Sequence, residues 1–421
     1  MAKQVKISKY GKKKKITENP YKMTDNTVVQ KDINDEYRIW RKNVPYNYDL
    51  LITHALSWPS LTCQWYPTAN RVNDSTVQDI LLCTHTSGKD QEYILIASVI
   101  IPDSIIEGAE TLGDGALSNA DGKIKFRMEI PVNDEINRAR FSPFANHILA
   151  TRSDGADTAV YDTTCHCNKS KRTAVPDLIL KGHLSGGYGV SWNTVKNGEI
   201  VTSGEDGLIC FYNINSTSKN KTMHPAQIFK EHESVVGDVC FSFYNPNVFV
   251  SVGDDRKIVY HDTRGMKAVS VRKDAHASDI FCVHYSPVED GLLATGGKDS
   301  CINIWDERKM DSPVFSLKTE DNEILQVQWS PHIGSCIASA GTDRRVRIWD
   351  LNNANVDISK NEAALNDGPA ELKFLHSGHT DTVCDFSWNP LEPMEICSVA
   401  EDNILQIWQQ TSSDVPYDIS E

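Results

Sequence analysis

The chain has 421 residues, of which 40% are hydrophobic, so it is long enough to bury a large core. No apolar run reaches about eighteen residues and no apolar segment opens the N-terminus, so we expect neither a membrane span nor a secretory signal. The formal net charge of −14 disfavours a sequence-specific nucleic-acid-binding body and favours basic protein partners inside the cell.

The first fifteen residues differ from the rest of the chain in charge. They contain seven lysines and no acidic residue, so subtracting them from −14 leaves −21 on the remainder. The run "KKKK" at 12–15 is compatible with a nuclear import signal, a DNA-contacting arm or a solvated tail. We expect residues 1–24 to form a disordered basic tail.

An amphipathic helix is predicted over residues 25–45. Val29, Ile33, Tyr37 and Trp40 follow one another at steps of four, four and three residues, which places them on one helix face. Pro45 is expected to end this helix. Its apolar stripe should pack on the last unit of the domain that follows.

A repeated phrase indicates the architecture of that domain. "ATGGKDSCINIWDERK" (294–309) and "ASAGTDRRVRIWDLNN" (338–353) share an apolar strand, a turn with Asp, and a strand ending in Trp-Asp. The same pattern recurs with a period near forty residues, which is typical of WD-repeat blades. Seven units follow it, at 60–102, 133–162, 182–213, 231–262, 275–309, 322–353 and 378–408. We therefore predict an all-β, seven-bladed β-propeller over residues 46–410, with a C-terminal tail at 411–421.

The recurring polar residues of the repeats are interpreted as structural. A His before the first strand of a unit can bond the turn Asp and, through Ser or Thr, reach the Trp of the third strand. The residues given this role are His183, Asp206, His276, Asp299, Trp305, Asp343, Trp349, His379, Asp402 and Trp408. None of them is predicted to be catalytic.

The eleven cysteines do not indicate a disulfide framework, because most lie within apolar strands. Cys165, His166 and Cys167 form the one metal-like cluster, but no second ligand pair follows at a suitable spacing, so we interpret it as a loop. No nucleophile elbow or phosphate-binding loop is present. We expect no metal, no cofactor and no enzymatic activity.

Segments outside the repeats close the ring and shape its edge. Residues 50–58 ("LLITHALSW") are expected to supply the outer strand of the last blade, because an unpaired edge promotes aggregation. An acidic, glycine-rich insertion covers 103–123, and a second insertion at 352–371 is expected between the strands of the penultimate and last blades. The second insertion and the N-terminal helix should border a groove.

Several stretches resemble the histone-binding WD-repeat proteins first known as retinoblastoma-binding. They include "INDEYRIWRKNVPYNYDLLITHALSWPSLTCQWYP" (33–67), "EINRARF" (135–141) and "DGPAELKFLHSGHT" (367–380). The resemblance implies a nuclear, non-enzymatic scaffold that binds histone H4 or H3–H4. Family members serve in chromatin assembly, type B acetyltransferase, deacetylase and remodelling complexes, and a fungal relative helps to load the centromeric H3 variant.

The resemblance implies a groove for a helix of histone H4 between the N-terminal helix and the second insertion. The matching positions are Ile39, Tyr46, Glu362, Asp367, Leu372, Phe374 and Leu375. The alternative is that Leu372, Phe374 and Leu375 are strand core, and alternation would place the first two on one face. The family's paired prolines are reduced here to Pro369 followed by Ala370.

A second implied site lies at the acidic mouth of the central channel, where the family receives the histone H3 tail. The positions assigned to it are Trp58, Pro59, His85, Glu135, Asn137, Arg138, Tyr188, Asp238 and Glu323. Gly186 and Gly237 replace family glutamates, and Leu325 replaces an aromatic residue. Asp238 and Glu323 are expected to compensate in part.

A rival interpretation is a substrate receptor of a cullin-type ubiquitin ligase. "HDTRG" (261–265) and "IWDERK" (304–309) end blades with Asp followed two residues later by Arg264 or Arg308, a short feature of such receptors. An adaptor subunit on purification would favour this alternative, and histones would favour the chaperone.

Overall fold

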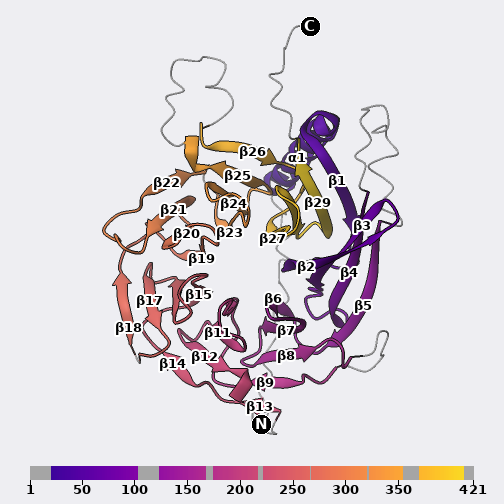
Figure 1. The fold of residues 1–421 in the computed structure, drawn as a ribbon. Coiled ribbons are helices and arrows are strands. Elements are labelled where there is room, and N and C mark those ends of the chain that lie inside the picture. Colours follow the sequence, from indigo (N-terminus) through magenta and orange to yellow (C-terminus); the bar gives the residue numbers. More distant parts are fainter. Residues whose placement is uncertain are drawn as a thin grey trace, which may run out of the picture.

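A computed structural model describes residues 20–102, 123–166, 174–216, 221–265, 267–319, 322–353 and 369–411, with side chains from residue 31 onward. The strands form seven sheets, which surround a central channel like the blades of a propeller (Figure 1). The predicted fold class, including the N-terminal helix packed on the last blade, is confirmed.

Among the described residues, the first three blades include the one sheet that has a fifth strand. Blade 1 contains β2 (Cys63–Val72), β3 (Ser75–Cys83), β4 (Glu92–Pro102) and β5 (Ile124–Val132). Blade 2 contains β6 (Ile136–Ser142), β7 (Ala145–Ser153), β8 (Thr158–Asp162) and β9 (Leu178–Leu180), with β13 (Thr222–Met223) added in parallel outside β9. Blade 3 contains β10 (Val190–Trp192), β11 (Glu199–Ser203), β12 (Ile209–Asn213) and β14 (Gln227–Phe229), with the short 3-10 helix η2 (Ile214–Ser216) between the last two.

The remaining blades are antiparallel sheets of four strands. Blade 4 contains β15 (Val236–Phe241), β16 (Val248–Gly253), β17 (Ile258–Asp262) and β18 (Ala268–Arg272). Blade 5 contains β19 (Ile280–Tyr285), β20 (Leu292–Gly297), β21 (Cys301–Asp306) and β22 (Phe315–Lys318). Blade 6 contains β23 (Ile324–Trp329), β24 (Cys336–Gly341), β25 (Val346–Asp350) and β26 (Leu372–His376), and η3 (Leu351–Asn353) follows β25. Blade 7 contains β27 (Val383–Trp388), β28 (Glu395–Ala400), β29 (Ile404–Gln410) and β1 (Tyr48–Ala55).

The ring closes through a strand from the start of the chain. β1 pairs antiparallel with β29, with Ile52 opposite Ile407 and Leu51 opposite Trp408. The predicted clasp is therefore present. Because β1 covers the outer edge of blade 7, the first and last segments of the domain stabilise one another.

The N-terminal helix α1 (Pro20–Asn47) lies against blades 6 and 7 (Figure 1). Its inner face buries Trp40 and Val44 among side chains of β25, β27 and β29, and Tyr37 packs beside them. The prediction that Pro45 ends the helix is wrong, because the helix continues to Asn47. Pro45 lies in the last turn, where its missing N–H costs only one helical hydrogen bond. The side chain of Val29 is outside the described residues.

Blades 5 and 7 contain the complete chain of polar contacts from turn to core. In blade 5, His276 Nδ1 lies 3.0 Å from Asp299, its Nε2 lies 2.8 Å from Thr295 Oγ1, and Trp305 Nε1 donates to the same oxygen at 2.9 Å. In blade 7, His379 lies 3.4 Å from Asp402 and 2.8 Å from Ser398 Oγ, to which Trp408 Nε1 donates. In blade 5 these buried polar groups are thereby satisfied, whereas in blade 7 His379 Nδ1 is buried without a hydrogen bond and is only in ion-pair range of Asp402.

Other blades keep part of this arrangement. In blade 3, His183 contacts Asp206 at 3.2 Å and Thr202 at 2.8 Å, but Tyr212 stands in place of the tryptophan. In blade 6, Trp349 Nε1 donates to Ser339 Oγ at 2.9 Å, while Asp343 pairs with Arg347. Each predicted residue therefore lies inside a blade.

Blade 4 contains a corresponding set that was not assigned from the sequence. His232 contacts Asp255 at 2.9 Å and Ser251 at 2.8 Å, and His261 Nε2 also lies 2.8 Å from Ser251 Oγ. His261 occupies the tryptophan position, is fully buried and stacks on Phe249 at 4.5 Å. The unit begins with Glu231-His232 instead of Gly-His or Ala-His and lacks the Trp, so the repeat pattern does not identify this set.

Thr295→Val should destabilise the propeller by about 2 kcal/mol or more. The substitution hardly changes the volume of the side chain, but Trp305 Nε1 and His276 Nε2 both lose a buried hydrogen-bond partner. Urea unfolding measures the change. Thr151→Val is the matched control, since the Thr151 hydroxyl donates only to the carbonyl of Ala159. Equal losses for the two variants would contradict the proposed role of Thr295.

The stability of blade 4 should depend on pH through His261. Burial, together with the smaller effect of the neighbouring His232, lowers the pKa of His261 to about 3. The unfolded chain therefore takes up a proton as the pH falls below about 6.5 while the folded chain does not, so stability is lost between those values at up to about 1.4 kcal/mol per pH unit. His261→Phe should reduce this slope, and replacement of the exposed His147 by Gln should leave it unchanged.

Candidate functional site

The outer face of α1 presents apolar side chains to solvent. Ile39 and Tyr46 are 62% and 60% exposed, and they lie seven residues apart on one helix face. Trp40 and Val44 occupy the opposite, buried face. The helix therefore has one apolar face that holds it to the propeller and a second that remains accessible.

Hydrogen bonds and ring contacts fix α1 in position. Trp40 Nε1 donates to Tyr48 Oη at 2.9 Å, and Tyr48 Oη lies 2.9 Å from His376 Nδ1. Burial holds the pKa of His376 well below its usual value, so its ring is neutral and Nδ1 can accept a hydrogen bond from the Tyr48 hydroxyl. Glu36 adds a contact to Arg344 of blade 6 at 3.0 Å. The exposed face of the helix is thus presented on a rigid support.

The structure separates the three β26 residues assigned to the groove. Phe374 packs on Tyr48 at 5.2 Å and Trp408 at 5.8 Å, beside α1. Leu372 instead packs with Trp349 in the core between blades 5 and 6. The expectation that both share one face is wrong, because the register shift between Ile348 and Trp349 places a bulge at Lys373.

The second insertion lies within blade 6. It joins β25 to β26, and both strands belong to the same sheet, so the expected position between the penultimate and last blades is corrected. Glu362 and Asp367 lie outside the described residues. The described chain resumes at Pro369, whose carbonyl accepts a bond from Leu372 N at 2.9 Å, and Leu375 in β26 is partly buried.

A cavity of about 720 Å³ opens at one mouth of the channel. Its walls carry five carboxylates, which belong to Asp154, Glu205, Asp254, Glu323 and Glu401. Burial raises the pKa of Asp254, and the nearby Asp279 and Asp255 raise it further. This concentration of negative charge favours a cationic ligand. Of the residues assigned to the peptide site, His85, Asn137, Arg138, Tyr188 and Glu323 line this cavity.

The other assigned residues lie elsewhere. Asp238 is 4% exposed and pairs with Arg138 at 2.7 Å below the mouth, so it cannot replace a lost glutamate there. Glu135 lies 3.7 Å from His85 and accepts a bond from Gly88 N. The carbonyl of Pro59 accepts a bond from His85 N, while Trp58 faces a separate cavity.

The backbone explains why the mouth has glycine at two positions. A Cβ atom at Gly186 would lie 2.7 Å from the carbonyl oxygen of Asp154, and one at Gly237 would lie 2.8 Å from that of Ile280. Side chains at either position would require the neighbouring backbone to move. The negative charge of this mouth therefore comes from the surrounding carboxylates.

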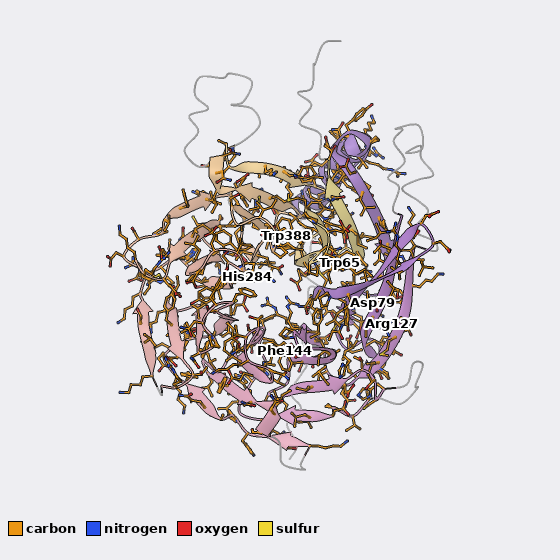
Figure 2. The ribbon with its side chains drawn as sticks, viewed as in Figure 1. Trp65, Asp79, Arg127, Phe144, His284 and Trp388 are labelled. Carbon is orange, nitrogen blue, oxygen red and sulfur yellow. The ribbon has the colours of Figure 1, made fainter. Side chains whose placement is uncertain are left out.

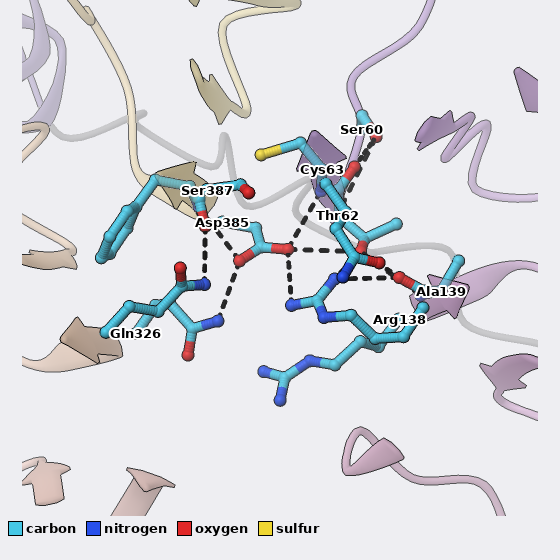
Figure 3. Close-up of polar contacts among 12 residues, drawn as sticks. Ser60, Thr62, Cys63, Arg138, Ala139, Gln326, Asp385 and Ser387 are labelled. Carbon is cyan, nitrogen blue, oxygen red and sulfur yellow. Dashed lines mark hydrogen bonds and ion pairs between the residues drawn. The ribbon is translucent and has the colours of Figure 1, made fainter. Parts of the chain in front are cut away.

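A polar network around Asp385 links four neighbouring blades, 6, 7, 1 and 2, at the channel (Figure 3). Asp385, 1% exposed, accepts hydrogen bonds from Arg140 at 3.0 Å, Gln326 at 2.9 Å, and Thr62 at 3.2 Å. A second cavity, of about 220 Å³, is lined by Arg140 and Gln326 of this network and shares only Arg138 with the acidic mouth. Figure 2 shows how side chains fill the blades around this channel.

The remaining sequence motifs make local contacts. Arg264 and Arg308 are exposed and each binds the Asp two residues before it, Asp262 or Asp306, through two nitrogen atoms. His166 lies 2.9 Å from Asp177, and Cys167 is outside the described residues. Within the described ranges, no group of three or more His, Cys, Asp or Glu side chains could hold a metal ion. No described helix is long and apolar enough to cross a membrane.

Comparisons with known proteins agree with this architecture. Residues 35–103 match the family model for the "Histone-binding protein RBBP4", which also describes a component of the CAF1 complex. Residues 223–262, 269–306, 311–350 and 371–409 match the "WD domain, G-beta repeat". The chain is 45% identical over 388 residues to "Histone acetyltransferase type B subunit 2" of Encephalitozoon cuniculi (strain GB-M1). The aligned region covers 91% of this chain and 98% of that relative. The chain belongs to the family of histone-binding WD-repeat proteins.

Proposed function

We propose that this protein is a non-enzymatic histone chaperone subunit that binds a helix of histone H4 beside α1. The observation that carries the proposal is the exposed pair Ile39 and Tyr46 on a helix that Trp40 and Val44 fix to the propeller. An amphipathic helix of a partner can bury its apolar face against such a surface. The matching family model covers α1 from residue 35 onward.

Electrostatics should orient the bound helix. Glu362 and Asp367 belong to the insertion that leaves blade 6 between β25 and β26, close in sequence to the β26 residue Phe374, which packs near α1. We propose that these carboxylates pair with arginine or lysine of the H4 helix, and that Leu372 and Leu375 support β26 from within the blade. Apolar burial would then supply affinity, and the charges would fix the direction.

The acidic mouth is proposed as a second histone site, for the basic tail of H3. Five carboxylates line it, whereas the exposed Ile39 and Tyr46 of α1 are apolar, so the two surfaces suit different parts of H3–H4. Replacing Glu323 or Glu401 by Gln should weaken a tail peptide and reduce the salt dependence of its binding. Arg138 remains paired with Asp238 and is expected to position the cavity wall.

The chromatin role follows from these two sites. We propose that the protein acts in the nucleus, with a cytoplasmic pool, and presents H3–H4 to larger chromatin-complex subunits. The similarity to a type B acetyltransferase subunit supports an acetylation complex, and chromatin assembly or loading of a centromeric H3 variant are further candidates. The buried His, Asp and Thr groups of blades 3, 5 and 7 stabilise the blades and are assigned no catalytic step.

Purification of the tagged protein from its own cells tests this role. Recovery of stoichiometric H3 and H4 supports the chaperone. Recovery of a ubiquitin-ligase adaptor that is lost in the Arg264→Ala and Arg308→Ala variants, without histones, would favour the receptor alternative.

A further inference from the structure

A separate cavity of about 280 Å³ lies on blade 1 and is walled by aromatic side chains. Trp58, Tyr93 and Phe126 line it together with the carboxylates of Asp90 and Glu129. The family resemblance assigns Trp58 to the channel mouth, but this cavity shares no lining residue with the mouth. Its chemistry therefore needs its own explanation.

The strand register brings these side chains to one face of blade 1. Tyr93 and Leu95 are two residues apart on β4, and Leu95 lies opposite Glu129 of β5. Phe126 would point to the other face in a regular strand, because it is three residues from Glu129. The register shift at Arg127 places Phe126 opposite Ala97 and so on the same face.

The cavity wall is held in place by buried contacts. Leu56 and Thr84 at the wall are 8% and 6% exposed, and Thr84 Oγ1 donates to Glu92 at 2.6 Å. Tyr93 N donates to Thr84 Oγ1 at 2.7 Å, which fixes the start of β4. The three aromatic rings are only partly buried, and Phe126 is further fixed by its contact with the ring of His54 at 5.8 Å between centroids.

The charges at this cavity favour a cation. Asp90 and Glu129 are exposed at its edge, and no Lys, Arg or His is among the lining residues. A cation over an aromatic face is attracted by the ring quadrupole, and aromatic walls suit the methyl groups of quaternary ammonium ions. An anion in this cavity would be repelled by the two carboxylates, and the lining residues provide no positive charge to bind it.

We propose that this cavity, the blade 1 pocket, binds the ammonium group of a lysine side chain, including its methylated forms. The inference rests on the proposed histone function for the source of that lysine. His85 lines the acidic mouth, and its backbone N donates to the carbonyl of Pro59, next to Trp58. A basic tail lying in the mouth can therefore extend past His85 and Pro59 and place a lysine in the blade 1 pocket.

The first experiment tests the chemistry with choline as the probe, measured by NMR titration of its methyl resonance. Trp58→Leu, Phe126→Leu and Glu129→Gln should each weaken choline binding about two- to fivefold. Phe144→Leu and Glu392→Gln are matched controls at exposed sites away from the pocket and should have no effect. Equal binding of the uncharged isostere 3,3-dimethyl-1-butanol, or equal binding by all variants, would overturn the proposal.

The second experiment identifies the source of the cation. A histone H3 tail peptide should bind more weakly when its lysines are replaced by norleucine, and the pocket variants should remove that difference. Choline binding without any effect of the variants on the peptide would overturn the assignment to a histone lysine. Binding of an H4 helix peptide, measured on the same samples, tests the proposed H4 site at Ile39 and Tyr46 of α1. A failure of that site can therefore be told apart from a failure of the blade 1 pocket.

Discussion

Asp385→Ala is expected to lower the free energy of unfolding by about 3 to 5 kcal/mol. The substitution removes one partner of a buried ion pair and leaves the Arg140 guanidinium without its carboxylate inside the channel. Gln326, Thr62 and the backbone N of Cys63 lose an acceptor at the same time. Because these groups come from blades 1, 2, 6 and 7, the loss should affect the closure of the whole ring. Chemical denaturation followed by tryptophan fluorescence measures it.

The matched control for this prediction is a surface ion pair. Asp157 and Lys181 are each about two-fifths exposed, so Asp157→Asn should change stability by no more than about 1 kcal/mol. A similar effect for Asp157→Asn and Asp385→Ala would show that the channel network contributes little to ring closure. The Arg140→Met, Asp385→Leu double variant should recover part of the loss, because it removes both charges together.

Trp40→Ala is expected to detach α1 from the propeller while the blades remain folded. The indole packs among the buried residues of blades 6 and 7, contacts His376 edge-on at 5.9 Å and donates to Tyr48. Removal of a buried tryptophan costs about 3 to 5 kcal/mol of stability. Here the lost contacts are those that dock α1 on the propeller, so the docking of this helix is what should weaken. Hydrogen exchange should show faster exchange in α1 than in β27–β29, and H4 peptide binding should be lost.

Arg38→Ala provides the control on the same helix. Arg38 is exposed and, among the described side chains, pairs with Asp35, which is also exposed, so its loss should leave the docking of α1 unchanged. Gly378→Ala should also weaken the docking of α1, but it should disturb blade 7 as well, because the added Cβ would meet Gln406 Oε1 before it meets the Trp40 ring at 2.7 Å. Retained H4 binding in Trp40→Ala with α1 in rapid exchange would contradict a site that includes this helix.

The repeat architecture could be predicted because each blade repeats a residue pattern with a physical purpose. The sets His276–Thr295–Trp305 and His379–Ser398–Trp408 satisfy buried polar groups at fixed spacing, so the period is visible in the sequence. Blade 4 shows the limit of this pattern. There His261 replaces the tryptophan and still reaches Ser251, a contact that only the packing on Phe249 reveals.

The candidate sites were less predictable because they depend on register and on close approach of the backbone. Bulges at Lys373 and Arg127 decide which side chains of β26 and β5 share a face, and alternation alone gives the wrong answer for Leu372 and Phe374. Similarly, Asp238 has the right charge for the mouth but is occupied by Arg138 below it. The types of these residues indicate that they could belong to a site. Their contacts in the folded chain determine whether each side chain reaches that site.

Binding of a labelled peptide covering the first helix of histone H4 tests the central claim most directly. Wild type should bind, Ile39→Ser with Tyr46→Ala should weaken binding at least about tenfold through lost apolar burial, and Asp367→Asn should reduce the salt dependence. Val269→Ser, which changes an equally exposed valine on blade 4, should bind as wild type does. Equal affinity of the Ile39/Tyr46 variant and wild type, or no binding by wild type, would contradict the assignment of the exposed face of α1 to histone H4.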